Sequence, residues 1–481
     1  MKDKLAFAIL AAGSGSRMKS EKPKVLQQIA HKSMLKRVTE TVRSQNPDFL
    51  TTVVRYKKED VAAEALSVCD SQVITVQDEI NGTGRAADLA GQSLMDAGFS
   101  DGTFVVITAD TPLLKPETLS KLLDMHTAHN NSATFLTTVV KNPAGYGRII
   151  RNSEGEFVKI VEELDANDAE RTVNEINVSV YAFDFVAFRD FIKQVKSDNK
   201  KGEIYITDVL SAMNAERVLY ANDAHTLFAN HVPDEKRIRI EALVERDYES
   251  LEGANDFIQL AAQAKVFNTR ICHKHMLNGV SIQDPETVWI DSEVQIAVNA
   301  VIHANTHLIG DCVIEEGAEI GPNTVLRDVV VHKNATVLSS DVTGAEIGEN
   351  ATVGPFSYIR AGTKMGESSK IGAYTETKAL SLGARSKIPH LSYAGDAEIG
   401  EGTNFGCGSI IANYDGVHKH KTRVGSNARI GSNTIFVAPV EVGDNVYTGA
   451  GSVVRENVPD GALAYSENSL TVREGWTEEN R

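Results

Sequence analysis

The sequence predicts an α/β doubly wound sheet followed by a parallel β-helix of hexapeptide repeats. The β-helix is predicted by apolar residues that recur every six positions: Ile290, Ile296, Ile302, Leu308, Ile314, Ile320 and Leu326. Neither a helical period of 3.6 nor a strand period of 2 gives this spacing, whereas each short face of a β-helix buries one aliphatic side chain per hexapeptide. The doubly wound sheet is predicted because strands alternate with helices through the N-terminal part of the chain.

The N-terminal half contains short β-branched runs separated by stretches with helical spacing. Strands are predicted at Leu5–Ala12, Thr51–Val54, Val73–Val76, Phe104–Thr108, Thr134–Val140, Phe157–Val161 and Val178–Phe183. Helices are predicted around Met34–Val42, Val61–Leu66, Ala86–Met95 and Pro116–His126. In such a sheet, ligands bind at the carboxyl ends of the strands. A polar helix from Asp256 to about Lys274 then connects this part to the repeats.

The six-residue register continues beyond its first, uninterrupted stretch. Further positions in register are Ile347, Val353, Ile359, Met365, Ile371, Ile399, Phe405, Ile411, Val424, Ile430, Phe436, Val442, Thr448 and Val454. A β-sandwich with chance spacing is the alternative, but seven consecutive matches favour the solenoid. We therefore expect an α/β domain at 1–257, a helical linker at 258–278, and a hexapeptide-repeat domain with a C-terminal tail at 279–481.

Composition narrows the classes of partner. The 481-residue chain is 42% apolar and 24% charged, with no apolar run long enough to cross a membrane. A formal charge of -16 argues against nucleic acid or anionic lipid as main partners. Cys69, Cys272, Cys312 and Cys407 are scattered without disulfide or metal-site spacing, so we expect a reducing, cytoplasmic location.

The sharpest motif is the Gly-rich segment after the first predicted strand, Leu10 to Met18, followed by Lys22-Pro23-Lys24. Small residues let a ligand approach the backbone, and N–H groups after a strand suit phosphate oxygens. Arg17 and Lys24 would add positive charge for a triphosphate. The segment is neither a Walker A loop nor a Gly-x-Gly-x-x-Gly fingerprint. By itself it also fits a plain Gly-rich turn with solvated cations.

The motif resembles the loop of the sugar-1-phosphate nucleotidyltransferases. Nearly the whole chain resembles the bifunctional family that joins an N-acetylglucosamine-1-phosphate uridylyltransferase to a glucosamine-1-phosphate N-acetyltransferase. The segments that carry this resemblance are Gln77, Asn81–Gly84, Ala109–Leu113, Gly145–Ile149, Ile160–Glu162, Glu175–Asn177, Gly202–Asp208 and Glu252–Asp256. The resemblance implies a nucleotidyltransferase domain and a left-handed β-helix that forms a homotrimer.

The resemblance implies a first site that binds UTP and the product UDP-N-acetylglucosamine. The implied binding residues are Leu10, Ala11, Ala12, Gly13, Lys24, Gln77, Gly82, Thr83, Thr108, Ala109, Asp110, Gly147, Glu162, Asn177 and Asn255. Mg²⁺ would bind to Asp110 and Asn255, since it prefers a few hard oxygen ligands completed by phosphates. Arg17 and Lys24 would assist attack of the sugar phosphate on the α-phosphorus of UTP. Taken alone, Asp110 and Asn255 could equally be helix or turn caps.

The chain departs from the family pattern beside this site. Ser16 replaces Thr, and Thr108-Ala109 stands where an aromatic-Gly pair is common. Val178-Ser179 replaces Thr-Gly, and Phe257 stands where Arg is usual. These changes bear on rate and sugar selectivity more than on the class of reaction.

The resemblance implies a second site where the hexads are interrupted. His390 would be the base that frees the amine of glucosamine-1-phosphate to attack acetyl-CoA, although a lone His is more often structural. Residues implied to bind glucosamine-1-phosphate are Arg360, Lys378, Tyr393 and Asn404, and those implied to bind acetyl-CoA are Cys407, Asn413, Tyr414, Ser432 and Ala450. Glu467 replaces an Arg that faces the CoA phosphates in the family, so weaker acetyl-CoA binding is expected.

The favoured interpretation is a cytoplasmic enzyme that acetylates glucosamine-1-phosphate and then uridylylates the product, supplying peptidoglycan and lipopolysaccharide precursors. Mg²⁺ is the expected cofactor, with acetyl-CoA and UTP as co-substrates. One alternative is a monofunctional nucleotidyltransferase whose β-helix serves oligomerisation or regulation. Another is a structural trimer with inactive sites.

Overall fold

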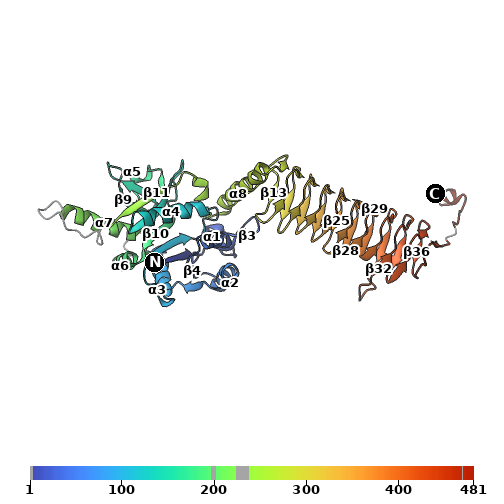
Figure 1. The fold of residues 1–481 in the computed structure, drawn as a ribbon, viewed down its shortest axis with the longest axis horizontal. Helices are drawn as coiled ribbons and strands as arrows, with labels where there is room; N and C mark the ends of the chain where they lie inside the picture. Colours follow the sequence, from blue (N-terminus) through green and yellow to red (C-terminus); the bar gives the residue numbers. More distant parts are fainter. Residues whose placement is uncertain (1–3, 197–201, 224–237, 468–469, 481) are drawn as a thin grey trace. The chain divides into compact units, whose positions relative to one another are not determined.

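Alternating side chains on the first strand of the N-terminal sheet build a core on each of its faces. Within β1 (Leu5–Leu10), Ala6 and Ala8 pack into one core and Phe7 and Ile9 into the other. Helices α3 (Thr83–Asp96), α6 (Phe185–Ile192) and α7 (Thr207–Asp223) supply the first core, and α1 (Met34–Arg43), α2 (Lys58–Val68) and α4 (Pro116–Ala128) supply the second. Helices therefore cover both faces of the sheet (Figure 1). The predicted doubly wound architecture is confirmed.

The computed structural model describes residues 4–196, 202–223, 238–467 and 470–480. They divide into two compact units, Met1–Phe267 and Asn268–Arg481. The helices of the first unit are α1 (Met34–Arg43), α2 (Lys58–Val68), α3 (Thr83–Asp96), α4 (Pro116–Ala128), α5 (Asp168–Arg171), α6 (Phe185–Ile192) and α7 (Thr207–Asp223), with 3-10 turns η1 (Ser16–Met18), η2 (Lys24–Leu26) and η4 (Tyr248–Ser250). Helix α8 (Phe257–Leu277) contains the division between the units, close to where a helix was predicted.

The main sheet of the first unit has the strand order β11-β7-β10-β6-β1-β4-β5. Its strands are β4 (Phe49–Val54), β5 (Val73–Val76), β6 (Thr103–Thr108), β7 (Ala133–Val139), β10 (Glu175–Asp184) and β11 (Ile240–Val244), with β8 (Arg148–Arg151) and β9 (Phe157–Val161) attached beside β10. A short hairpin pairs β2 (Gln28–Ile29) with β3 (Lys32–Ser33). Strand β10 runs antiparallel between β6 and β7, while β1 pairs in parallel with β4 and β6. The ends of β1, β4, β5 and β6 therefore open onto one edge of the sheet.

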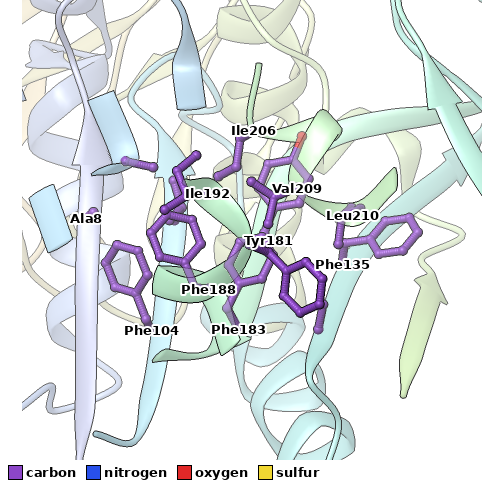
Figure 2. Packing of buried hydrophobic residues seen from close by; sticks show 14 of the residues in the cluster. Ala8, Phe104, Phe135, Tyr181, Phe183, Phe188, Ile192, Ile206, Val209 and Leu210 are labelled. Atoms are coloured by element: carbon purple, nitrogen blue, oxygen red, sulfur yellow. The ribbon is translucent and has the colours of Figure 1, made fainter. Parts of the chain in front are cut away.

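Aromatic side chains fill the first core between the sheet and helices α6 and α7. Figure 2 shows Phe104, Phe183 and Phe188 together, and the Phe188 ring centroid lies 5.0 Å from that of Phe104 and 5.1 Å from that of Phe183. Ring packing at these separations adds to the stabilisation from buried area. Phe104 lies near the start of β6 and pairs with Phe183, so this aromatic layer lies toward the amino end of β6, away from the carboxyl ends at which ligands are expected.

The second unit is a parallel β-helix in which each strand pairs with the strand about one coil later in the chain (Figure 1). One face contains β12 (Ser281–Ile282), β15 (Val301–Ile302), β18 (Glu319–Ile320), β21 (Thr336–Val337), β24 (Thr352–Val353), β27 (Lys370–Ala373) and β29 (Lys387–His390), and later the pair β35 (Tyr447–Thr448) and β37 (Leu463–Ala464). The second face contains β13 (Trp289–Ile290), β16 (His307–Ile309), β19 (Val325–Arg327), β22 (Asp341–Thr343), β25 (Tyr358–Ile359), β31 (Ile410–Ala412), β33 (Ile435–Val437) and β36 (Val453–Val454). The third contains β14 (Gln295–Ile296), β17 (Val313–Ile314), β20 (Val330–Val331), β23 (Glu346–Ile347), β26 (Lys364–Met365), β32 (Thr422–Val424) and β34 (Val440–Val442).

The long strands β28 (Glu376–Leu382) and β30 (Tyr393–Ile399) continue from the second face into the third. The predicted hexad positions stack on one another: Ile290 pairs with Leu308, and Leu308 with Leu326. Nearly all of them are buried, and Ile296 alone among those predicted is only partly buried. A three-hexad coil explains this register, because residues three hexads apart then share one face. The predicted hexapeptide β-helix is confirmed, and its parallel sheets are consistent with the left-handed form.

The C-terminal segment ends with a short helix, α9 (Trp476–Glu479). Across the part of the chain that the structure describes, no helix combines the length and apolar character needed to span a membrane.

Candidate functional sites

The Gly-rich segment leaves β1 and folds back against Lys24. Gly15 has φ +65°, and a Cβ at this position would lie 2.4 Å from Lys24 Cβ, so only glycine lets the two backbones approach so closely. A Cβ on Gly13 would meet nothing within 4 Å. The loop therefore packs on the Lys24 side chain and leaves the backbone at Gly13 open.

Gly13 opens onto a cavity of about 790 Å³ at the carboxyl ends of the strands. Predicted residues that line it are Leu10, Ala12, Gly13, Lys24, Gln77, Gly82, Thr83, Thr108 and Asp110. Its volume is in the range of small-molecule sites. Gly82 has φ +119°, and a Cβ there would lie 2.0 Å from the Ile204 carbonyl oxygen. The loop at Gly82 thus packs directly against the segment before α7.

Six of the fifteen predicted binding residues do not line this cavity, and for two of them, Ala11 and Ala109, the reason is the direction of the side chain. The side chains of Ala11 and Ala109 are 3% and 1% exposed and belong to the core on the opposite face of the sheet. Adjacent side chains of a strand point to opposite faces, so the side chains of Leu10 and Ala12 face the cavity and that of Ala11 points into the core. For the same reason the Ala109 methyl group lies in the core and does not crowd a ligand.

Four predicted residues from distant parts of the chain meet at the edge of the cavity. Lys24 Nζ donates to Asp110 Oδ2 at 2.5 Å and to Asn255 Oδ1 at 3.1 Å. An Arg17 guanidinium nitrogen donates to the same Asn255 oxygen at 2.8 Å. Burial acts to raise the pKa of Asp110, but the charge and hydrogen bond of Lys24 outweigh it and hold that pKa below its usual value. Asp110 is therefore an anion at neutral pH and can bind a cation.

The predicted sugar-binding residues also lie together. A Cβ on Gly147 would be 3.4 Å from Glu162 Oε1 and 3.5 Å from Asn177 Cβ, and the Asn177 N–H donates to the Gly147 carbonyl at 2.9 Å. A bulge in β10 follows Asn177, and Ser179 adopts φ +56°. This left-handed conformation favours glycine, so Ser179 adds backbone strain beside the predicted sugar-binding residues.

An ion pair between a buried arginine and a partly exposed glutamate holds the loop that carries Gly147. The Arg148 side chain is 2% exposed and donates to Glu163 Oε2 at 2.7 Å and to the Tyr146 carbonyl. The Gly145 N–H donates to the same Glu163 oxygen at 3.0 Å. The Gly145 hydrogen bond and Arg148 hold the pKa of Glu163 below its usual value. The carboxylate therefore fixes both ends of the loop.

Arg55, Tyr56, Glu203 and Tyr205 line the cavity without having been predicted as site residues. Arg55 donates to Asn81 Oδ1 at 2.6 Å and so supports the loop before Gly82. Its place directly after β4 was the available signal, since ligands bind at strand ends. Glu203 and Tyr205 lie in a segment that carried the family resemblance, but no role had been given to them.

The predicted phosphate-binding residues of the coil form a second cluster. Arg360 pairs with Glu376 at 3.0 Å, and Lys378 Nζ lies 3.5 Å from Asp396 Oδ1. Asn413 Nδ2 donates to Asp396 Oδ2 at 2.6 Å and contacts the Tyr393 hydroxyl at 3.4 Å. Lys419, which was not predicted, interacts with Lys378, and the proximity of the two cations lowers the pKa of Lys419.

Cations crowded together without enough carboxylates indicate an anion site. Lys419 follows Asn413 and Tyr414 in a loop that leaves the coil. In this loop Tyr414 and Lys419 form an antiparallel β-bridge, and the Tyr414 hydroxyl donates to the Gly416 carbonyl at 2.6 Å. Asn404 lies on the neighbouring face, bridged to Lys387 and Arg429.

His390, Cys407, Ser432 and Ala450 occupy the same corner of four successive coils. The residue after each has a positive φ, and its N–H donates to the carbonyl of the preceding corner residue: Gly408 to His390 at 3.2 Å, Asn433 to Cys407 at 2.7 Å and Gly451 to Ser432 at 2.8 Å. The His390 side chain is exposed, and within the described ranges its ring has no hydrogen-bond partner. The predicted base thus continues a column of predicted acetyl-CoA residues. Glu467 is exposed in the tail.

An α/β sheet with a phosphate-type loop, followed by a hexapeptide coil with its own polar cluster, defines a two-domain transferase. Residues 7–172 match the model of the MobA-like NTP transferase domain, and residues 293–328, 344–379 and 421–456 match the bacterial transferase hexapeptide model of six repeats.

Curated relatives match the chain over almost its whole length. The bifunctional protein GlmU of Bifidobacterium longum strain NCC 2705 is 45% identical over 471 residues, and that of Bifidobacterium adolescentis is 47% identical over 474 residues; each alignment covers 98% of both chains. The bifunctional protein GlmU of Paenarthrobacter aurescens strain TC1 is 44% identical over 99% of this chain and 92% of its own. The chain belongs to the GlmU family of bifunctional proteins. It is an enzyme with nucleotidyltransferase and acetyltransferase activities, which sets aside the monofunctional and structural interpretations.

Proposed function

We propose that the chain makes UDP-N-acetylglucosamine in two steps, by acetylating glucosamine-1-phosphate on the coil and then transferring UMP from UTP to the product in the N-terminal cavity. The observation that carries the nucleotidyl step is the meeting of Arg17, Lys24, Asp110 and Asn255 beside the Gly-rich loop. The cavity of about 790 Å³ would take a nucleotide with a sugar phosphate. The product would feed cell-wall synthesis in the cytoplasm.

In the nucleotidyl step, a phosphate oxygen of the sugar phosphate attacks the α-phosphorus and pyrophosphate leaves. The open backbone at Gly13 would approach the nucleotide, with Gln77 and Thr83 beside its base and ribose. Glu162 and Asn177 would hold the amino sugar. Lys24 and Arg17 would stabilise charge on the phosphates, so catalysis would rest on positioning and electrostatics with no protein nucleophile.

Asp110 and Asn255 fit the proposed Mg²⁺. Their Oδ2 and Oδ1 atoms already share one cation, the Lys24 ammonium, so both oxygens reach a common point. Mg²⁺ is usually held by one or two protein oxygens together with substrate phosphates. When bound, it would neutralise phosphate charge during the transfer.

In the acetyl step, the amine of glucosamine-1-phosphate attacks the thioester carbonyl of acetyl-CoA and the CoA thiol leaves. His390 would take a proton from the amine. Arg360 and Lys378, with Lys419 added here, would bind the sugar phosphate, and Tyr393, Asn404 and the Asn413–Tyr414 pair would surround the sugar and acetyl group. Acetyl-CoA would lie along the column of Cys407, Ser432 and Ala450. Direct transfer gives Cys407 no nucleophilic role.

A homotrimer formed through the β-helix is part of the proposal. Phe356, Tyr374 and Leu391 occupy one corner of three successive coils with positive φ, and their exposed fractions are 59%, 61% and 60%. Asn and Gly are the usual residues at such φ values, and bulky ones are outliers. Three adjacent exposed apolar side chains in strained positions are typical of an interface. The proposed limits of the parts remain 1–257, 258–278 and 279–481.

Two separate assays test the functional assignment. Pyrophosphate release is measured with UTP, N-acetylglucosamine-1-phosphate and Mg²⁺, and thiol release with glucosamine-1-phosphate and acetyl-CoA. Asp110→Asn should lose the first activity and keep the second, whereas His390→Ala should do the reverse. Full acetyl transfer by His390→Ala, or full uridylyl transfer by Asp110→Asn, would refute the respective assignment. Light scattering tests the trimer, and a monomeric mass would refute it.

A further inference from the structure

Lys24 contacts both of the oxygen atoms proposed to bind Mg²⁺. Its ammonium lies 2.5 Å from Asp110 Oδ2 and 3.1 Å from Asn255 Oδ1. A metal ion would need lone pairs of the same two oxygens at about 2.0–2.1 Å. If the ammonium and a divalent cation bound to these two oxygens at the same time, the two positive charges would lie within a few ångströms of each other. They would then repel each other strongly, because little water would lie between them to screen the charges.

The surroundings hold Lys24 in this position. Its side chain is 13% exposed, and the close approach of Gly15 confines its Cβ. The two acceptors are also fixed, because the Ala254 N–H donates to the Asp110 carbonyl at 3.0 Å. The Asn255 N–H in turn donates to Gln259 Oε1 at 2.8 Å. The contact is therefore a built arrangement and differs from that of a solvated surface lysine.

We propose that Lys24 is the resident cation of the metal site and leaves it when the metal arrives with the nucleotide. Lys24 lines the same cavity as Gly13 and Ser14, so a nucleotide phosphate there gives the displaced ammonium a new partner. Metal and nucleotide then bind cooperatively, since each removes the cost that Lys24 imposes on the other. This inference rests on the proposed function, and it adds that the empty enzyme has low affinity for the free metal ion.

The test is direct binding of Mn²⁺, which like Mg²⁺ prefers oxygen ligands, to the full-length protein without nucleotide. Free Mn²⁺ is measured by electron paramagnetic resonance. Lys24→Met should bind Mn²⁺ at least about tenfold more tightly than the wild type, a factor that corresponds to 1.4 kcal/mol. Lys24→Arg keeps the charge and should show no such gain.

Arg17→Met is the matched control for loss of positive charge near the site. Arg17 donates to Asn255 Oδ1 at 2.8 Å, and among the described residues it makes no hydrogen bond to Asp110. Its removal should therefore raise Mn²⁺ affinity clearly less than removal of Lys24. A UTP analogue that cannot be cleaved should raise Mn²⁺ affinity more in the wild type than in Lys24→Met. Thermal unfolding of each variant establishes that it is folded.

The inference is overturned if Lys24→Met binds Mn²⁺ no more tightly than the wild type, or if Arg17→Met gains as much. Asp110→Asn separates this failure from failure of the proposed metal site. If Asp110→Asn abolishes Mn²⁺ binding while Lys24→Met shows no gain, only the displacement is wrong. If Mn²⁺ binding is insensitive to Asp110→Asn, the metal assignment itself is wrong.

Discussion

Two glycine-to-alanine substitutions in the same cavity should have opposite effects on the protein. At Gly13, an added Cβ meets nothing within 4 Å, and φ does not fall in the left-handed region. At Gly82, φ is +119° and the added Cβ would lie 2.0 Å from the Ile204 carbonyl oxygen. The first methyl group intrudes only on a ligand, and the second only on the fold.

The expected magnitudes follow from these geometries. Gly13→Ala should stabilise the fold by about 0.4–1 kcal/mol, because alanine restricts the unfolded chain. Its methyl group should cost bound nucleotide about 1–3 kcal/mol through overpacking, which raises the KM for UTP roughly 5- to 150-fold. Gly82→Ala combines overlap with backbone strain, so we expect a loss of roughly 2–6 kcal/mol of stability.

The bifunctional chain supplies its own control for this experiment. Acetyl transfer should be unchanged in Gly13→Ala, because its proposed residues lie in the other unit. The KM for N-acetylglucosamine-1-phosphate should also be nearly unchanged. A KM for UTP within twofold of the wild type would refute the placement of the nucleotide at Gly13. Wild-type stability of Gly82→Ala, measured by urea unfolding, would refute the argument from the Ile204 contact.

Three further predictions concern other residues. Burial lowers the pKa of His126 from 6.5 to about 4. As pH falls, this histidine therefore takes up a proton in the unfolded chain before it does so in the folded chain. The free energy of unfolding is unaffected above pH 6.5 and decreases below it, by about 2 kcal/mol at pH 5. Hydrogen exchange of α4 should show this loss in the wild type and not in His126→Gln, and an equal loss in both would contradict it. Glu163→Gln leaves the buried Arg148 cation without its carboxylate, and should raise the KM for N-acetylglucosamine-1-phosphate several-fold with the KM for UTP unchanged; parallel changes in both would indicate general damage. Glu467→Arg should lower the KM for acetyl-CoA, because an arginine would attract the CoA phosphates that the glutamate repels. An unchanged KM would contradict this assignment of Glu467.

The β-helix could be predicted from sequence in nearly full detail because its burial pattern is local. Each hexad residue becomes buried by the same short strand geometry, and pairing simply repeats one coil later. The α/β sheet was predicted in outline for the same reason, since β5 and β9 match their apolar runs. The sequence gives no local indication that β10 runs antiparallel between β6 and β7, because an apolar run has the same pattern in a parallel and an antiparallel buried strand.

The sites were less predictable because they depend on contacts across the chain. Lys24 meets Asp110 and Asn255 only after the sheet has formed, and spacing along the sequence gives no sign of this. Family resemblance supplied that assignment. That the side chains of Ala11 and Ala109 point away from the cavity could have been predicted from sequence, because strand alternation turns them away from Leu10 and Asp110. Exposed cations such as Lys419 have no periodicity and were missed.

The two folds suit the two proposed ligands in different ways. Strand ends of the sheet converge, so residues far apart in sequence surround one compact cavity. Coils of the β-helix stack instead, and a corner position recurs in every coil at the strand spacing of about 4.8 Å. His390, Cys407, Ser432 and Ala450 occupy four successive coils, so their column extends over roughly three such spacings, or about 14 Å. A column of that length suits an extended ligand such as acetyl-CoA. The stretch from Cys407 to Ser432 is longer than the stretches before and after it, because it contains the loop with Tyr414 and Lys419. The column stays in line because this loop leaves and rejoins the coil between β31 and β32, so that β31 still pairs in register with β33.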